Sequence, residues 1–268
     1  MADVKFDNEV VHQGNSDATR INIVVATRKR KDEFKSMPLF KTVVSRMCFG
    51  NDVTIERSIA FCNTEGLGTV YNSAISTFGD CDMYVFVHDD IWINDVMFVD
   101  KLMSASKSYD VIGCCGGKAW GMPSDTSNPI IWTYAANDAG MSGFMVHASD
   151  SEIVHAEKSS KYDGKALFAT NYGVAPSAVL TLDGSFICFT RNAVSKGLRF
   201  DENFKFHFYD MDVSFEAYVR KLKVGTSAIL LTHESLGTSA AQPSYMDAQR
   251  MFLKKWFSVE AKPSVDTQ

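Results

Sequence analysis

The segment from Met83 to Asp90 constrains the fold most strongly, because an unbroken apolar run changes there abruptly to charge. Met83 to Val87 reads Met-Tyr-Val-Phe-Val, which is typical of a strand buried on both faces. His88, Asp89 and Asp90 follow directly. Ligands of open α/β sheets bind beyond the carboxyl ends of the strands, so we expect these side chains to face a ligand through a metal ion. The structural alternative is a turn or the cap of a following helix.

Strand-like and helix-like segments alternate through the first half of the chain. The expected strands are Ile21 to Ala26, Ser58 to Cys62, Met83 to Val87 and Asp110 to Cys115. The expected helices, with apolar residues three and four apart, are Glu33 to Cys48, Thr69 to Phe78 and Asp95 to Ser106. This alternation predicts an α/β domain with a mostly parallel central sheet flanked by helices.

The second half departs from this rhythm. Residues 117 to 178 are rich in Gly, Ser, Asn and Asp, which predicts an irregular insertion with short strands at Met141 to Val146 and Ser151 to Ala156. Later elements are a strand at Phe186 to Phe189, a helix at Val213 to Leu222, a strand at Val224 to Leu231 and a helix at Tyr245 to Phe257. We expect a flexible leader over residues 1–20, one domain over 21–240, and a C-terminal helix and tail over 241–268.

Composition narrows the class of protein. The 268 residues are 46% hydrophobic and 22% charged, which is ordinary for a soluble globular domain. The net charge of -5 argues against a nucleic-acid partner, because a protein that binds nucleic acid usually carries a stripe of basic residues. The six cysteines form no CxxC pair and are expected to be buried thiols. We find neither a secretory signal nor an apolar run of transmembrane length, so the expected location is cytoplasmic.

Several polar motifs occur in an order that resembles one enzyme family. They are Thr27, Asn63, Gly66-Leu67-Gly68, Tyr71-Asn72, His88-Asp89-Asp90, Asp183-Gly184, Tyr209-Asp210-Met211-Asp212 and His233. Over about residues 21 to 240 the chain is similar to the GT-A-type, family 2-like glycosyltransferases, nearest to small single-domain members with a His-x-Asp form of the Asp-x-Asp motif. The resemblance implies a GT-A-like domain that transfers a hexosyl group, with inversion, from a nucleotide-diphospho-sugar to a hydroxyl of a glycan or glycoconjugate. A UDP-sugar is the favoured donor.

The resemblance also implies a divalent metal that neutralises the leaving diphosphate. Asp90 is expected to be the main ligand, and His233 to complete the metal or diphosphate site. His88 is either a further ligand or a residue that shapes the turn. Oxygen ligands favour Mn²⁺ or Mg²⁺, and imidazole tilts the choice towards Mn²⁺. Asp89 is expected to contact the ribose or to support the ligands.

An inverting transfer needs a base that takes the proton of the acceptor hydroxyl. Asp210 aligns with the family's catalytic aspartate. Tyr209 stands where the family usually has glutamate, so Asp212 remains an alternative base. Asp183 and Gly184 match the loop where donor sugar and acceptor meet.

Nucleotide contacts are expected at two neighbouring strand ends. The resemblance assigns base and ribose contacts to Thr27 and Asn63. Arg28 or Arg30 could approach a phosphate, or these arginines could be solvated surface charges. Tyr71 and Asn72 are further candidates. Aromatic residues of the insertion, namely Trp120, Trp132 and Tyr134, are expected either to stack on sugar rings or to pack in the core.

Two other function classes remain open. A metal-dependent nucleotidyltransferase or phosphohydrolase could use a similar sheet, but the former would need a glycine-rich loop after the first strand, and Thr27 to Lys31 contains no glycine. A non-catalytic carbohydrate-binding module would not need two acidic sites and a late histidine. Metal-dependent binding of a nucleotide diphosphate distinguishes these classes.

Overall fold

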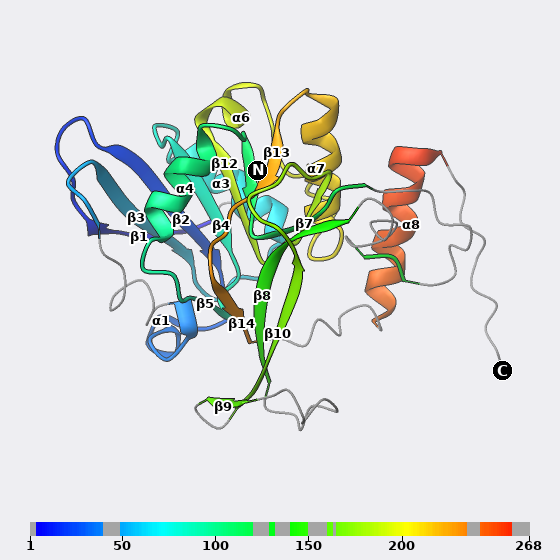
Figure 1. The fold of residues 1–268 in the computed structure, drawn as a ribbon, viewed down its shortest axis with the longest axis horizontal. Coiled ribbons are helices and arrows are strands. Elements are labelled where there is room, and N and C mark those ends of the chain that lie inside the picture. Colours follow the sequence, from blue (N-terminus) through cyan, green and yellow to red (C-terminus); the bar gives the residue numbers. More distant parts are fainter. Residues whose placement is uncertain are drawn as a thin grey trace.

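The described part of the chain forms two β-sheets, and helices cover both faces of the central one (Figure 1). The structure is a computed structural model that describes residues 4–39, 49–119, 129–131, 140–149, 160–162, 165–234 and 242–258. The predicted α/β class is confirmed. No helix in these ranges is both long and apolar enough to cross a membrane.

The central sheet has the strand order β1-β3-β2-β4-β12-β6-β13. Its strands are β1 (Asp7–His12), β2 (Thr19–Ala26), β3 (Val53–Ala60), β4 (Met83–Val87), β6 (Val111–Gly113), β12 (Phe186–Thr190) and β13 (Val224–Thr226). Five of them run in one direction, whereas β1 and β12 run against their neighbours. The sheet is therefore mixed rather than strictly parallel, and most of its strands run in one direction, as the sequence predicted. Between β6 and β12 the chain forms β7 to β11 of the second sheet, and β12 then runs antiparallel to both β4 and β6.

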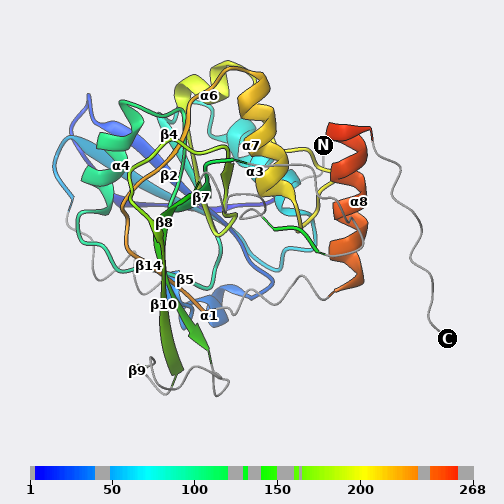
Figure 2. The ribbon, with the colours of Figure 1, turned by 45° about the vertical axis from the view of Figure 1, so that its right-hand side comes forward.

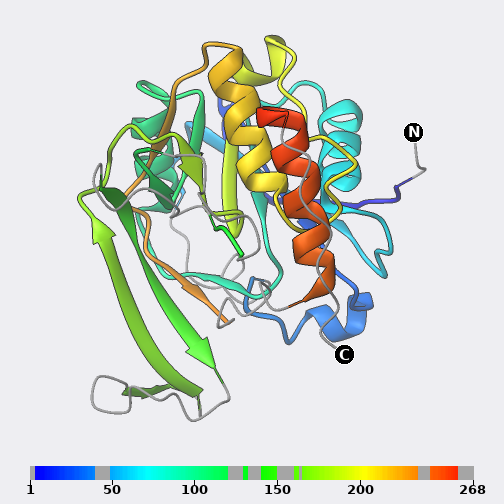
Figure 3. The ribbon, with the colours of Figure 1, turned by 90° about the vertical axis from the view of Figure 1, so that its right-hand side faces the viewer.

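The second sheet consists of short strands around one long hairpin. It contains β5 (Ile91–Ile93), β7 (Cys115–Gly117), β8 (Met141–Ser149), β9 (Ser160–Tyr162), β10 (Lys165–Gly173), β11 (Thr181–Leu182) and β14 (Leu231–His233). The hairpin of β8 and β10 projects beyond the central sheet with β9 at its tip (Figures 1–3). Within residues 117–178, the strand expected at Met141 to Val146 is present as the first part of β8, whereas the long strand β10 was not expected. Ser151 to Ala156, Trp120, Trp132 and Tyr134 lie outside the described residues.

The helices pack on two apolar faces of the central sheet. They are α1 (Lys31–Phe34), α3 (Leu67–Thr77), α4 (Phe98–Ser106), α6 (Arg191–Ser195), α7 (Tyr209–Val219) and α8 (Pro243–Phe257). Strand β4 contributes side chains to both cores. Tyr84 and Phe86 belong to the core beneath α3, α7 and α8, and Val85 and Val87 belong to the core beneath α4. All five residues of β4 are buried, as its apolar sequence predicts.

Two boundaries differ from the expectation. Residues 7–12 do not belong to a flexible leader, because β1 pairs with β3 and covers its backbone edge. The side chains reinforce this pairing, since Glu9 forms an ion pair with Arg57. Where a helix was expected from Glu33 to Cys48, the short helix α1 already ends at Phe34 and a turn follows, and residues 40–48 lie outside the described part. The C-terminal helix is confirmed by α8, which lies alongside α7 (Figure 3).

Gly143 allows β8 to approach the end of β6 closely. It has a φ of 117°, and a Cβ at this position would overlap the carbonyl oxygen of Cys114. We expect Gly143→Ala to lower the free energy of unfolding by about 1–3 kcal/mol, because it adds backbone strain and a clash. Urea unfolding measures the loss.

Gly140→Ala is the matched control. Gly140 also has a positive φ, of 86°, but a Cβ there would make only an ordinary contact, 3.9 Å from the Lys118 Cδ. It should therefore show the backbone cost alone, about 1–2 kcal/mol or less. Equal losses for the two variants would contradict the close approach of β8.

Candidate functional site

Three parallel strands place polar residues at one edge of the central sheet. Thr27 follows β2, Asn63 follows β3, and Asp89 follows β4. The buried Thr27 hydroxyl donates a hydrogen bond of 2.5 Å to the Asp89 carboxylate, and the Asn63 N–H donates one of 2.8 Å to the Thr27 carbonyl. Burial raises the pKa of Asp89, although the bond from Thr27 opposes the rise. The strand-end residues singled out in the sequence therefore do meet.

Strand β12 brings a distant loop to the same edge. Phe186 pairs with Val87 in the antiparallel register, and the His88 N–H donates to the Ser185 carbonyl at 3.1 Å. Asp183 closes its own turn, because its carboxylate accepts hydrogen bonds from the backbone N–H and hydroxyl of Ser185. The Asp183-Gly184 loop thus lies beside His88.

The late histidine reaches this edge through the second sheet. Strand β14 pairs with β5 so that His233 lies opposite Ile91, and the Glu234 N–H donates to the Asp90 carbonyl at 3.0 Å. The His233 Nε2 lies 3.4 Å from Asp90 Oδ1. Burial would raise the pKa of Asp90, but the neighbouring His233 outweighs it, so that pKa falls below its ordinary value.

His88, Asp90 and His233 form a candidate metal centre. One ligand atom from each residue lies within 4.8 Å of the others. Asp90 Oδ1 is buried and has no hydrogen-bond partner among the described residues. Because an unsatisfied buried carboxylate oxygen is costly, and because one carboxylate with two imidazoles suits a divalent transition metal, these residues fit such an ion. Burial lowers the pKa of His88, which favours the neutral ring that a metal requires.

Asp210 enters the site on the first turn of α7. The residue before this helix, Phe208, has a left-handed φ of 64°, a strain typical of functional sites. Burial, with a smaller effect of Asp183, raises the pKa of Asp210 to about 7. A Cβ on Gly184 would lie 2.6 Å from the Tyr209 hydroxyl and 3.1 Å from the Asp210 Cβ. Only glycine therefore lets the Asp183-Gly184 loop approach α7 this closely.

Asp212 serves a different contact. Its side chain is 1% exposed, and its Oδ1 lies 2.7 Å from the Lys255 ammonium and accepts a 2.8 Å bond from the Trp256 indole. Both partners belong to α8. The carboxylate of Asp212 thus fastens α7 to α8.

The remaining nucleotide candidates are placed unequally. Arg28 is exposed beside Thr27 and forms no ion pair with a described residue. Tyr71 is 1% exposed and packs its ring against Phe86 in the core. Asn72 uses its amide to bond both backbone groups of Phe200. These two side chains hold the fold together, so their expected nucleotide contacts gain no support from the structure.

Three aromatic residues near the metal candidates were missed in the sequence. Phe206 is 52% exposed and stacks on His88 with ring centroids 6.1 Å apart. His147 stacks on Phe168 across the hairpin, and its ring lies 6.3 Å from that of His233. The aromatic run from Phe200 to Phe208 gave a signal for Phe206, but only the pairing of β8 with β14 reveals His147.

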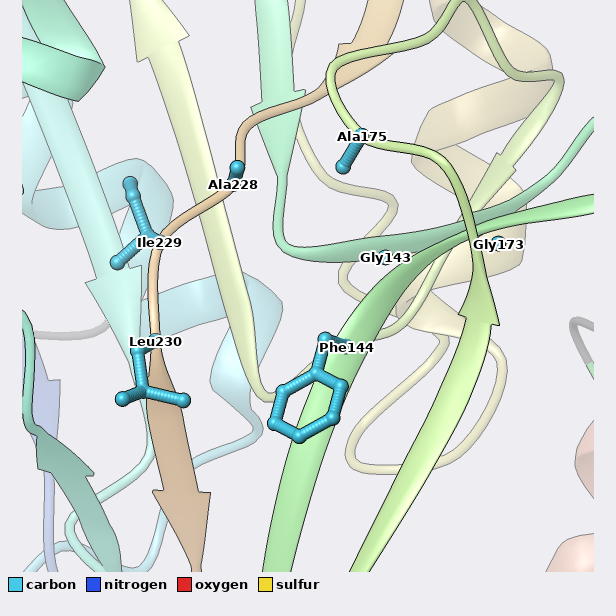
Figure 4. A pocket seen from close by; sticks show the side chains of 7 residues that line it. All are labelled: Gly143, Phe144, Gly173, Ala175, Ala228, Ile229 and Leu230. Carbon is cyan, nitrogen blue, oxygen red and sulfur yellow. The ribbon is translucent and has the colours of Figure 1, made fainter.

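A small apolar pocket lies at the base of the hairpin, apart from these polar groups. Gly143, Phe144, Gly173, Ala175, Ala228, Ile229 and Leu230 line it (Figure 4). No lining residue carries a titratable or hydrogen-bonding side chain, so this pocket offers no group for acid–base chemistry or metal binding.

Comparison with known proteins identifies the family. A sequence model described as "Glycosyltransferase like family" matches residues 38–256. No curated protein sequence matches the chain. Similar solved structures include A197 from STIV, at 12% identity and a TM-score of 0.41 over 78% of this chain and 82% of that one. Residues 1–349 of S. aureus TarS give 14% identity and a TM-score of 0.43 over 90% of this chain and 72% of that one.

The assignment rests on the family match, since the TM-scores describe only loose superpositions. The match covers most of the chain and includes every residue of the candidate metal centre together with Asp210. The chain belongs to the glycosyltransferase-like family.

Proposed function

We propose that this protein is an inverting, metal-dependent glycosyltransferase that moves a sugar from a nucleotide-diphospho-sugar to a hydroxyl of a glycan or glycoconjugate. The observation that carries the proposal is the buried Oδ1 of Asp90, which accepts no hydrogen bond from a described residue and lies within 4.8 Å of a ring nitrogen of His88 and of His233. Asp210, whose pKa is raised, packs against Gly184, and the loop of Gly184 and Ser185 lies beside His88. A metal ligand set beside a carboxyl group that titrates near neutral pH suits sugar transfer better than carbohydrate binding alone.

The donor binds across the ends of β2, β3 and β4. Thr27 and Asn63 contact the base and ribose, and their mutual backbone bond supports a joint role. Asp89, which Thr27 holds, contacts the ribose. The exposed Arg28 guanidinium approaches a phosphate. UDP-sugars are the first donors to test.

His88, Asp90 and His233 would hold Mn²⁺ or Mg²⁺, and His88 with His233 favours Mn²⁺. A divalent cation there supplies charge stabilisation to the departing diphosphate. The protein residues supply the other requirements, namely binding of donor and acceptor and removal of a proton.

Asp210 acts as the general base. The acceptor oxygen forms a bond to the anomeric carbon from the face opposite the leaving group, the carbon–oxygen bond to the diphosphate breaks, and the acceptor proton passes to the Asp210 carboxylate. The Asp183-Gly184 loop, which packs against Asp210, positions the reacting sugar. Asp212 is unsuited to this role because Lys255 and Trp256 engage its carboxylate.

A panel of nucleotide-sugars tests the function directly. We expect slow release of a nucleotide diphosphate from at least one donor, accelerated by Mn²⁺ and abolished by a chelator. If no nucleotide diphosphate raises the melting temperature, with or without metal, the proposal fails. Metal-dependent cleavage of a nucleoside triphosphate with no nucleotide-sugar turnover would favour the nucleotidyltransferase or phosphohydrolase class.

Asp90→Ala tests the metal centre by itself. We expect Mn²⁺ binding, measured by isothermal titration calorimetry without nucleotide, to be lost because the only carboxylate of the ligand set is gone. Asp100→Ala, which removes an exposed carboxylate of α4, is the matched control and should bind Mn²⁺ as the unaltered protein does. Equal affinities for the two variants would place the metal elsewhere.

Asp210→Asn should retain metal and donor binding but lose transfer by about 10²–10⁴-fold, which is the usual contribution of a general base. Because the free carboxyl group has a pKa of about 7, it is protonated and inactive below that pH. The kcat/KM of the unaltered protein should therefore rise with pH through about 7, and the residual rate of the variant should not.

Asp212→Asn is the contrasting variant. It weakens the contacts to Lys255 and Trp256, so we expect a lower melting temperature with the pH profile of transfer preserved. A loss of transfer in Asp212→Asn with normal stability would reverse the assignment of the base.

A further inference from the structure

The hydroxyl of Tyr209 connects three parts of the site that come from different elements. It lies 2.9 Å from the Nε2 of His88 and donates a hydrogen bond of 2.5 Å to the carbonyl of Gly184. The side chain belongs to the first residue of α7 and is 3% exposed. One buried phenol thus contacts the candidate metal ligand His88 and the Asp183-Gly184 loop. Its residue directly precedes the proposed base, Asp210.

The two contacts of this hydroxyl determine which nitrogen of His88 carries a proton. The Gly184 carbonyl can only accept a hydrogen bond, so the single phenol proton points to it. The hydroxyl oxygen must then accept from His88, which requires a proton on Nε2. A neutral imidazole has one protonated nitrogen, so the lone pair that can bind a metal is on Nδ1.

The surroundings hold both rings in place. Tyr209 packs against Tyr71 and Phe200, with ring centroids 6.1 and 5.9 Å apart. Phe206 stacks on His88 with an angle of 18° between the ring planes. Because the phenol has little room to turn, it acts as a fixed acceptor for the imidazole N–H.

We propose that Tyr209 is a positioning residue that holds His88 as its Nε2–H tautomer and so makes Nδ1 the metal-binding nitrogen. This inference rests on the proposed metal centre and deepens it. Partners that orient a metal-binding histidine through its other nitrogen typically change metal affinity by about 10–100-fold when removed. The Tyr209 hydroxyl contacts His88 through Nε2, the nitrogen that does not bind the metal, and it also donates a hydrogen bond to the Gly184 carbonyl.

The first test measures the tautomer in the metal-free protein. In ¹⁵N-histidine-labelled protein, with the His88 signals identified by their loss in His88→Asn, NMR should show a protonated Nε2 and an unprotonated Nδ1. Tyr209→Phe removes the acceptor and should abolish this preference. A protonated Nδ1 in the unaltered protein would overturn the proposal whether or not a metal binds.

The second test measures Mn²⁺ affinity by calorimetry. Tyr209→Phe should bind Mn²⁺ about 10–100-fold more weakly than the unaltered protein. Tyr84→Phe is the matched control, because it also removes a buried phenol that bonds a backbone carbonyl, here that of Phe78, and should bind normally. Unchanged affinity in Tyr209→Phe, or equal losses in both variants, would contradict the positioning role.

A double-variant comparison separates this role from general destabilisation. In the His88→Asn background, Tyr209→Phe should cause no further loss of Mn²⁺ affinity, whereas independent effects would add. Additive losses would overturn the proposal. If the unaltered protein bound no Mn²⁺, both the proposed metal centre and the role of Tyr209 in it would be refuted. If it bound Mn²⁺ but carried its proton on Nδ1 of His88, only the role of Tyr209 would be refuted.

Discussion

The antiparallel pairing of β12 with β4 is the interaction on which the site depends. It places Phe186 opposite Val87, so the loop before β12 meets the residues after β4 at one edge of the sheet. The bond from the His88 N–H to Ser185 continues this pairing beyond both strands. Helix α7 then approaches because Gly184 lacks a side chain. The position of Asp183 next to His88 therefore depends on this register.

The site carries an energetic cost that the surrounding core must offset. Asp90 Oδ1 is buried without a hydrogen bond, Asp210 is buried enough to raise its pKa to about 7, and Phe208 has a left-handed backbone. Against this, each fully buried large apolar side chain of β4 contributes about 1.5–3 kcal/mol. The apolar burial of β4 thus offsets the destabilisation caused by the polar residues at its carboxyl end.

The two aspartates at the start of α7 show why sequence spacing alone was insufficient. Asp210 and Asp212 are two residues apart, so on a helix their side chains point in widely different directions. The structure directs Asp212 to Lys255 and Trp256 of α8. No feature near Asp212 in the sequence indicates this, because its partners lie more than forty residues later. The core contacts of Tyr71 and Asn72 were not foreseen for the same reason, since their partners are distant in sequence.

By itself, the sequence determined the α/β class, the buried strand from Met83 to Val87, the helix at α8 and the polar residues that follow the strands. These features depend on local periodicity, which neighbouring residues fix. Only the tertiary structure decided the direction of β12, the order of the hairpin strands and the approach of His233 to Asp90. Those depend on which strand edges meet, because hydrogen bonds between distant segments set the register. The proton on His88 follows from such a contact, since Tyr209 lies 121 residues away along the chain.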